Sequence, residues 1–131
     1  MHDYLFVYGT LRQQFTHPMA KWLSLRAQWL GSATYQGRLY QVKHYPGVVP
    51  SNNPDERVYG DVYQFPTDSV LLGELDRYEE CGPVFAHPNE YVRLRQPVSL
   101  SDGQLFKAWV YIYNRDFQQL AQIKSGDFLQ R

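Results

Sequence analysis

The feature that most constrains the fold is a run of apolar and aromatic residues near the N-terminus, residues 4–8, that ends at a glycine. Such side chains fit a covered, pleated surface, so the run predicts a buried β-strand. Gly9 has no Cβ and permits a sharp turn and a close approach to a ligand. We expect unpaired backbone N–H groups there that suit a carboxylate or an oxyanion. On local chemistry alone, a plain turn with Thr10 bonded to its own backbone is the commoner outcome.

Length and composition indicate one globular domain, predicted to span residues 1–131. The 13 basic and 13 acidic residues cancel, so the chain lacks the basic field that non-specific nucleic-acid binding needs. No apolar run reaches membrane-spanning length, and no signal peptide is recognisable, so we expect no membrane partner and a cytoplasmic location. Cys81 is the single cysteine, which fits a reducing compartment. No Cys/His cluster has zinc spacing, so we expect no metal and no cofactor.

Strands dominate the expected secondary structure. Period-two patterns and turn signals predict strands over residues 29–35, 38–42, 57–65, 92–98 and 105–113, with a short extended piece at 47–50. Helices are expected from Pro18 to near Arg26 and over residues 69–80. In the strand at 57–65, one face is expected to be buried. Many strands with two short helices predict an α+β fold, a small mixed β-barrel flanked by short helices.

Glu79 is a candidate proton-transfer group. Leu71, Leu75 and Glu79 are four residues apart, so they share one face of the second predicted helix, whereas Glu80 turns toward solvent. A carboxylate on a buried face has a raised pKa, which suits a proton shuttle near neutral pH. From the residues alone, a helix-end glutamate paired with a nearby arginine is the slightly favoured alternative.

Six segments resemble the gamma-glutamylcyclotransferase-like family, in the family's order. Val7-Tyr8-Gly9-Thr10-Leu11-Arg12 is similar to its Tyr-Gly-(Ser/Thr)-Leu signature. The other five segments are residues 44–50, 58–63, 75–79, 91–93 and 108–111. Residues 75–81 look most like the branch that acts on gamma-glutamylamines, which favours an amine as the leaving group.

The resemblance implies a gamma-glutamyl(amine) cyclotransferase. The substrate's free α-amino group would attack its own γ-carbonyl, close a five-membered ring and release 5-oxoproline. Glu79 would be the single general acid/base. Tyr111 would contact the substrate, with Tyr113 as the alternative on the same side of the strand. The carboxylate and the oxyanion would be bound by backbone N–H groups of Tyr8, Gly9, Thr10 and Leu11.

Other polar residues are expected to be structural. Arg93 is expected to pair with Asp76 or Glu79 or to line the mouth of the pocket. Asp61 and Asp76 are expected to be structural, and nothing predicts a nucleophile pair from Cys81 and His87. Residues 80–89 hold two prolines and a glycine, a departure from the family's simplest form that we expect to shape the leaving-group side of the pocket.

Two alternatives to this activity stay open. The first is a non-catalytic module that binds a small carboxylated metabolite; a desolvated Glu79 beside an anion argues against it. The second is another acyl-transfer enzyme that releases a glutamyl unit from a carrier, and the balanced charge does not favour it. In each case the partner is a small-molecule substrate or ligand, and we expect a monomer or a weak dimer.

Overall fold

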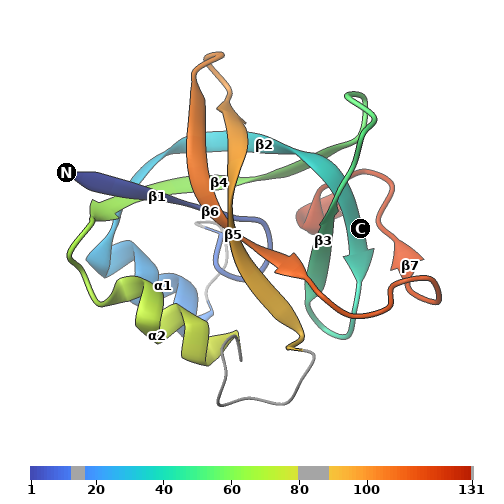
Figure 1. Ribbon diagram of the computed structural model, residues 1–131, viewed down its shortest axis with the longest axis horizontal. Coiled ribbons are helices and arrows are strands. Elements are labelled where there is room, and N and C mark those ends of the chain that lie inside the picture. The colour runs from blue at the N-terminus through green and yellow to red at the C-terminus, as the bar shows by residue number, and fades with distance from the viewer. Residues whose placement is uncertain (13–16, 80–88, 131) are drawn as a thin grey trace.

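The computed structural model describes residues 1–12, 17–79 and 89–130 (Figure 1). Within them, seven strands form one sheet in the order β1-β4-β2-β3-β6-β5, with β7 paired to β2. The strands are β1 (His2–Val7), β2 (Gln28–Gln41), β3 (Pro46–Pro50), β4 (Arg57–Pro66), β5 (Tyr91–Leu100), β6 (Leu105–Tyr113) and β7 (Ala121–Gln122). The helices are α1 (Pro18–Arg26), α2 (Leu71–Tyr78) and the 3-10 helix η1 (Phe128–Gln130).

Additional pairings close this sheet into a barrel. β1 pairs with β6 in parallel at Leu5 and Trp109, which completes the ring β1-β4-β2-β3-β6. β3 also runs parallel to β6, whereas the other strand pairs are antiparallel, so the sheet is mixed. α1 and α2 lie together on one side of the barrel (Figure 1). The predicted α+β fold, a small mixed barrel flanked by short helices, is confirmed.

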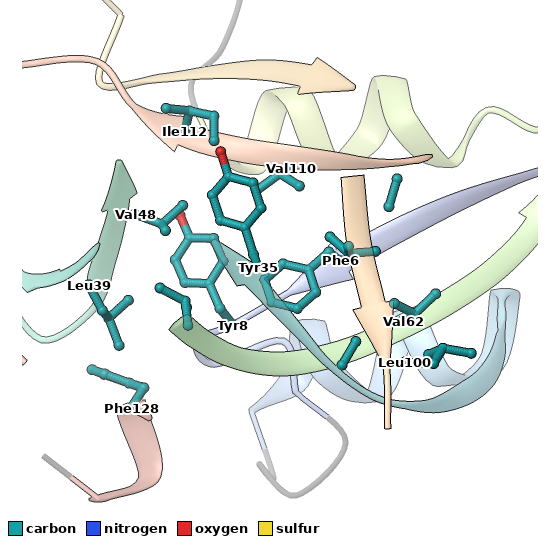
Figure 2. Close-up of a cluster of buried hydrophobic side chains, with 14 of the residues drawn as sticks. Phe6, Tyr8, Tyr35, Leu39, Val48, Val62, Leu100, Val110, Ile112 and Phe128 are labelled. Atoms are coloured by element: carbon teal, nitrogen blue, oxygen red, sulfur yellow. The ribbon is translucent and has the colours of Figure 1, made fainter. Parts of the chain in front are cut away.

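The N-terminal strand is buried on both faces, which explains its continuous apolar run. Phe6 and Tyr8 belong to a cluster of buried side chains that fills the barrel and includes residues from each of the strands β1 to β6 (Figure 2). Leu5 and Val7 belong to a second cluster, in which α1 contributes Leu23 and α2 contributes Leu71 and Leu75. Successive side chains of a strand point to opposite faces, so β1 lies between the two cores.

The strand β4 is buried on both faces, whereas burial of one face was predicted. Its expected buried face does contribute Val58 and Val62 to the barrel core. Its other face is not solvated, because Tyr63 and Phe65 are buried in the second cluster. The helices supply the apolar surface that covers this face, and an antiparallel strand covered on both faces loses its simple alternation.

The strand β2 is longer than predicted. One strand of 14 residues stands where two strands separated by Gly37 were expected. Gly37 stays within the ladder, paired with Pro50. A Cβ at this position would lie 2.6 Å from the Val49 carbonyl oxygen and 2.9 Å from the Tyr35 ring. The glycine therefore permits close packing inside a strand and does not end it.

The helices and the last hairpin follow the sequence pattern closely. α1 begins at Pro18 and ends at Arg26 as predicted, and β5 and β6 form the predicted hairpin. α2 is shorter than predicted, because it ends at Tyr78 and Glu79 is its C-cap, with its N–H donating to the Leu75 carbonyl oxygen at 2.8 Å. The expected orientation of Glu80 lies outside the described residues. None of the helices in the described ranges is long and apolar enough to cross a membrane.

Candidate active site

A cavity of about 240 Å³ lies at the end of β1, lined by residues from both core clusters. Sites for drug-sized ligands usually measure roughly 300–1,000 Å³, so this cavity suits a small ligand. Tyr113, the sequence-based alternative to Tyr111, does not line it. The cavity brings together the six residues to which the resemblance assigned a catalytic or substrate-binding role: Tyr8, Gly9, Thr10, Leu11, Glu79 and Tyr111.

The turn after β1 forms one wall of the cavity. The Arg12 N–H donates to the Gly9 carbonyl oxygen at 3.1 Å. Among the described residues, no backbone carbonyl accepts from the N–H groups of Gly9, Thr10 or Leu11, so these three remain candidate donors to a ligand. Gly9 has no left-handed φ, and a Cβ there would lie 2.9 Å from Pro46 Cδ. Glycine is therefore required by the close approach of the turn to β3, and not by a special backbone conformation.

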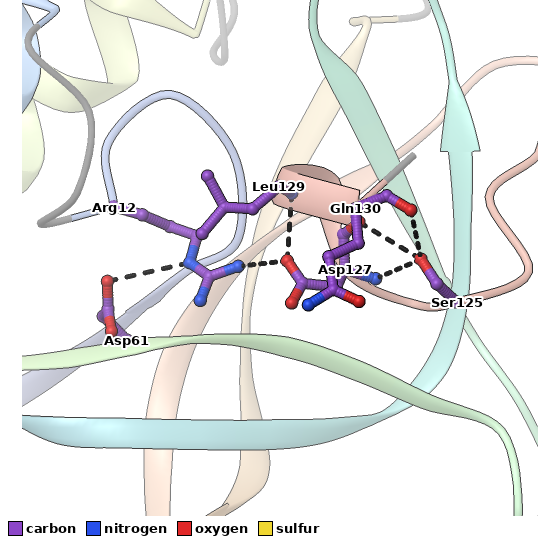
Figure 3. A network of polar contacts seen from close by, with 6 residues as sticks. All are labelled: Arg12, Asp61, Ser125, Asp127, Leu129 and Gln130. Atoms are coloured by element: carbon purple, nitrogen blue, oxygen red, sulfur yellow. Dashed lines mark hydrogen bonds and ion pairs between the residues drawn. The ribbon is translucent and has the colours of Figure 1, made fainter.

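A buried ionic network supports this turn from behind. Arg12 is 5% exposed, and its Nη1 donates to Asp127 Oδ1 at 2.8 Å (Figure 3). Its Nε lies 3.7 Å from Asp61 Oδ2. Asp127 Oδ1 also accepts from the Leu129 N–H at 2.9 Å, which ties in η1. The turn is thus held between β4 and the C-terminal segment, and Asp61 has the structural role expected for it.

Glu79 contributes one of the two carboxyl groups that line the cavity. Among the described residues, no side chain donates a hydrogen bond to it and no arginine or lysine lies within ion-pair distance. The residue is half-buried, at the junction of α2 and the cavity. Burial, followed by the negative charges of Glu90 and Asp76, raises the pKa of Glu79 from its ordinary value of 4.5 to about 8.

Asp76 lies three residues earlier on α2 and has the opposite environment. Arg93 binds both of its oxygens, with Nε–Oδ1 and Nη2–Oδ2 distances of 2.7 and 2.9 Å. The Tyr111 hydroxyl donates to Asp76 Oδ1 at 2.7 Å. The Arg93 guanidinium also lies over the Trp109 ring, 4.6 Å from its centroid. Arg93 therefore takes the first of the roles expected for it, and Tyr111, a lining residue of the cavity, donates its hydroxyl to Asp76.

The sequence analysis missed a second cavity carboxyl, Glu90. The Tyr45 hydroxyl donates to Glu90 Oε2 at 2.6 Å, and both residues line the cavity. Nearby, the Tyr91 hydroxyl donates to the Pro46 carbonyl oxygen at 2.6 Å. Tyr45, Pro46 and Tyr91 stand in family-like segments, which could have drawn attention to them. Glu90 stands in no pattern, so no sequence signal pointed to it.

Tyr8, Tyr45, Tyr91 and Tyr111 line the cavity as neutral hydrogen-bond donors. The Tyr8 hydroxyl donates to the Tyr111 carbonyl oxygen at 2.5 Å. Burial first, and then the negative charge of Glu79, raises the pKa of Tyr8 well above 10. Burial likewise raises the pKa of Tyr91 and Tyr111. These hydroxyls hold the walls in place and supply no acid or base near neutral pH.

Two expectations concern residues that the structure does not describe. The segment 80–89, expected to shape the leaving-group side, is described only at Asn89, and Cys81 and His87 lie outside the described residues. Within the described ranges, no group of three or more His, Cys, Asp or Glu side chains is arranged to hold a metal ion.

Comparisons with known proteins agree with this architecture. The model of the family described as gamma-glutamyl cyclotransferase, AIG2-like, matches residues 5–130. The gamma-glutamylcyclotransferase family protein YtfP of Escherichia coli (strain K12) is 36% identical over 128 residues, which cover 97% of this chain and 96% of YtfP.

Solved structures show the same fold. YkqA from Bacillus subtilis matches with a TM-score of 0.71 and 26% identity, over 98% of this chain but only 40% of the YkqA chain. An AIG2-like protein from Mus musculus matches with a TM-score of 0.72 over 94% of this chain and 86% of that chain. Its identity of 21% makes it a likeness of fold alone.

Proposed function

Because this chain belongs to the AIG2-like gamma-glutamyl cyclotransferase family, we propose that it releases 5-oxoproline from a gamma-glutamyl amide, with Glu79 as the general acid/base. One observation carries the role of Glu79. Its carboxyl group lies in the same cavity as the N–H groups of the turn after β1, has no described partner, and has a pKa of about 8. A base with a pKa near the working pH transfers protons most effectively.

The reaction needs little beyond positioning and proton transfer. The substrate's α-nitrogen forms a bond to its γ-carbonyl carbon, and the bond from that carbon to the leaving nitrogen breaks. Two protons pass from the attacking nitrogen to the leaving nitrogen, so an α-ammonium and an amide become a neutral lactam and a leaving ammonium. Folding the substrate supplies proximity, because nucleophile and carbonyl belong to one molecule.

Glu79 is proposed to carry these protons. In the empty cavity at pH 7 it is mostly protonated, since its pKa is about 8. The positive charge of an incoming α-ammonium favours the ionised carboxylate, which then accepts the first proton. The resulting carboxylic acid can donate to the leaving nitrogen. A single group thus serves as base and then as acid.

The turn after β1 is proposed to bind the anionic parts of the substrate. Backbone N–H groups of Tyr8, Gly9, Thr10 and Leu11 would receive the α-carboxylate and the oxyanion that develops on the γ-carbonyl oxygen. Donors fixed in advance need no reorganisation during the reaction, and the Arg12 network holds this turn in place. The Tyr111 ring would form an adjacent wall against the substrate.

The test is 5-oxoproline release from gamma-glutamyl amines, gamma-glutamyl-ε-lysine, gamma-glutamyl amino acids and glutathione. The Glu79→Gln variant keeps the shape and removes the proton carrier, so kcat should fall by roughly 10²- to 10⁴-fold. Its thermal stabilisation by 5-oxoproline should persist, because the anion donors are intact. The matched control is Glu74→Gln, which changes an exposed glutamate of the same helix.

The possible outcomes separate the alternatives. Turnover by the wild type that survives in Glu79→Gln would show that another group is the base. Stabilisation by 5-oxoproline without turnover of any substrate would instead favour a module that binds a small carboxylate.

A further inference from the structure

The cavity contains acidic groups, and none of the described lysines and arginines lines it. Two carboxyl groups line it, Glu79 and Glu90, and the remaining titratable lining residues are tyrosines and the two histidines His17 and His44. Among the described lining residues there is no lysine and no arginine. Because like charges oppose each other at short range, a ligand that carries positive charge suits this cavity better than one that carries extra negative charge.

Glu90 is held in a defined position beside the more exposed part of the cavity wall. The Tyr45 hydroxyl donates to one of its two oxygens, Oε2, and among the described residues no basic side chain forms an ion pair with it. His44, which precedes Tyr45, is exposed, and its ring meets the Tyr45 ring edge-on at 5.0 Å. Glu90 therefore keeps acceptor capacity for a further donor on the side where the wall reaches solvent.

The reaction itself indicates which part of the substrate meets Glu90. The attacking nitrogen must lose a proton, and Glu79 is proposed to accept it. A second carboxylate on this nitrogen would stabilise its ammonium form and oppose the attack. The leaving part of the substrate is under no such constraint, and it must extend away from the turn that binds the glutamyl unit.

We propose that Glu90, oriented by Tyr45, is a specificity-determining residue that binds a positively charged group on the leaving amine. The preferred substrates are then gamma-glutamyl monoamides of diamines, whose free end is an ammonium. A leaving group that ends in a carboxylate is disfavoured, because it meets the charge of Glu90. This inference rests on the proposed function, in which the glutamyl unit is bound at the turn after β1.

The experiment compares three gamma-glutamyl amides of equal length that differ only at the free end. The aminobutyl amide ends in an ammonium, the n-pentyl amide in a methyl group, and the carboxypropyl amide in a carboxylate. For the wild type, kcat/KM should be about 10- to 100-fold higher for the aminobutyl than for the pentyl amide, as expected for a hydrogen bond to a charged group. The carboxypropyl amide should be the poorest substrate.

Variants assign this preference to Glu90. In Glu90→Gln the ratio between the aminobutyl and pentyl amides should fall to near one, while turnover of the pentyl amide shows that the protein is folded. In Tyr45→Phe the ratio should be intermediate, because Glu90 remains but loses its orienting donor. In Glu74→Gln, an exposed glutamate outside the cavity, the ratio should be unchanged. The ratio cancels any effect of Glu90 on Glu79, because both substrates share that step.

A binding measurement keeps this inference separate from the proposed function. The dissociation constants of the aminobutyl and pentyl amides are measured by calorimetry with Glu79→Gln and with the double variant Glu79→Gln, Glu90→Gln. Tighter binding of the aminobutyl amide that disappears in the double variant supports the inference even if the wild type turns over none of the amides, a result that would overturn the proposed function. Equal dissociation constants, or a preference that survives without Glu90, overturn the inference.

Discussion

Acidic side chains lie on both sides of the turn after β1, but their electrostatic environments are opposite. Behind the turn, Arg12 lies between Asp61 and Asp127, so the buried negative charges have a cation among them. In front of it, the cavity holds Glu79 and Glu90 with no described lysine or arginine in its lining. Buried charges persist in proteins when they are paired, so the first arrangement is that of a structural support. The second leaves Glu79 poised to gain or lose a proton and is that expected of a working site.

Removing the cation behind the turn should have the largest effect on stability. Arg12→Met removes the cation that pairs with Asp127 and lies close to Asp61, and breaking a buried pair in this way costs about 3–5 kcal/mol. Urea unfolding measures the change. The matched control is Arg77→Met, whose exposed pair with Glu74 is worth about 0–1 kcal/mol. Equal decreases in the free energy of unfolding of the two variants would show that the Arg12 network contributes no more stability than a surface ion pair.

Removing the Glu79 carboxyl group, in front of the turn, should stabilise the protein only above about pH 4.5. The pKa of Glu79 is about 8 in the folded chain and about 4.5 in the unfolded chain, so folding favours the protonated form. Below pH 4.5 this group costs no stability; as pH rises toward 8 the cost grows by up to about 1.4 kcal/mol per pH unit.

The free energy of unfolding of Glu79→Gln should therefore exceed that of the wild type by about 4 kcal/mol at pH 8 and match it below about pH 4.5. Urea unfolding across this pH range, with Glu74→Gln as the control, provides the measurement. A constant difference between Glu79→Gln and the wild type would mean that the pKa of Glu79 is not raised.

Tyr111 lines the cavity, but its hydroxyl donates a hydrogen bond to Asp76, a carboxyl group that is paired with Arg93. Tyr111→Phe removes one hydrogen bond to Asp76, whose pairing with Arg93 remains, so the loss of stability should be about 1 kcal/mol. KM should change little, since the ring is retained. A large increase in KM with unchanged stability would mean that the hydroxyl binds substrate. Tyr113→Phe, outside the cavity lining, is the control.

The sequence predicted the elements of the site that depend on local spacing. The continuous apolar run of residues 4–8 predicts a strand, and the four-residue spacing of Leu71, Leu75 and Glu79 predicts one helix face; both signals are local to the chain. The glutamate stayed in the cavity lining even though α2 ends one residue before it, because the C-cap continues the path of the last turn.

The sequence did not predict the features that depend on register between distant strands. Tyr45 and Glu90 are 45 residues apart, and β6 lies between β3 and β5, where Ile112 pairs with Val48 on one side and with Val92 on the other. Neither residue stands in a periodic pattern of its own. The covered outer face of β4 was missed for the same reason, since nothing in its alternation shows where the helices pack.

The smallest expected effect tests whether the two cavity carboxyls act on each other. The negative charge of Glu90 helps to raise the pKa of Glu79, after burial and before Asp76. Glu90→Gln should therefore lower the pKa of Glu79 but leave it above 4.5, because burial and Asp76 remain. The difference in stability between the Glu90→Gln protein and a Glu79→Gln, Glu90→Gln protein should therefore stop growing at a lower pH than the difference between the wild type and Glu79→Gln.

This shift can be followed in turnover as well. With the pentyl amide as substrate, the rise of kcat/KM toward alkaline pH should occur at lower pH in Glu90→Gln than in the wild type, since ionised Glu79 is available earlier. Glu74→Gln should leave the profile in place. If Glu90→Gln also leaves it in place, the two carboxyls are electrostatically independent. The contrast with the Arg12 network would then rest on the burial of Glu79 and the charge of Asp76, and not on the negative charge of Glu90.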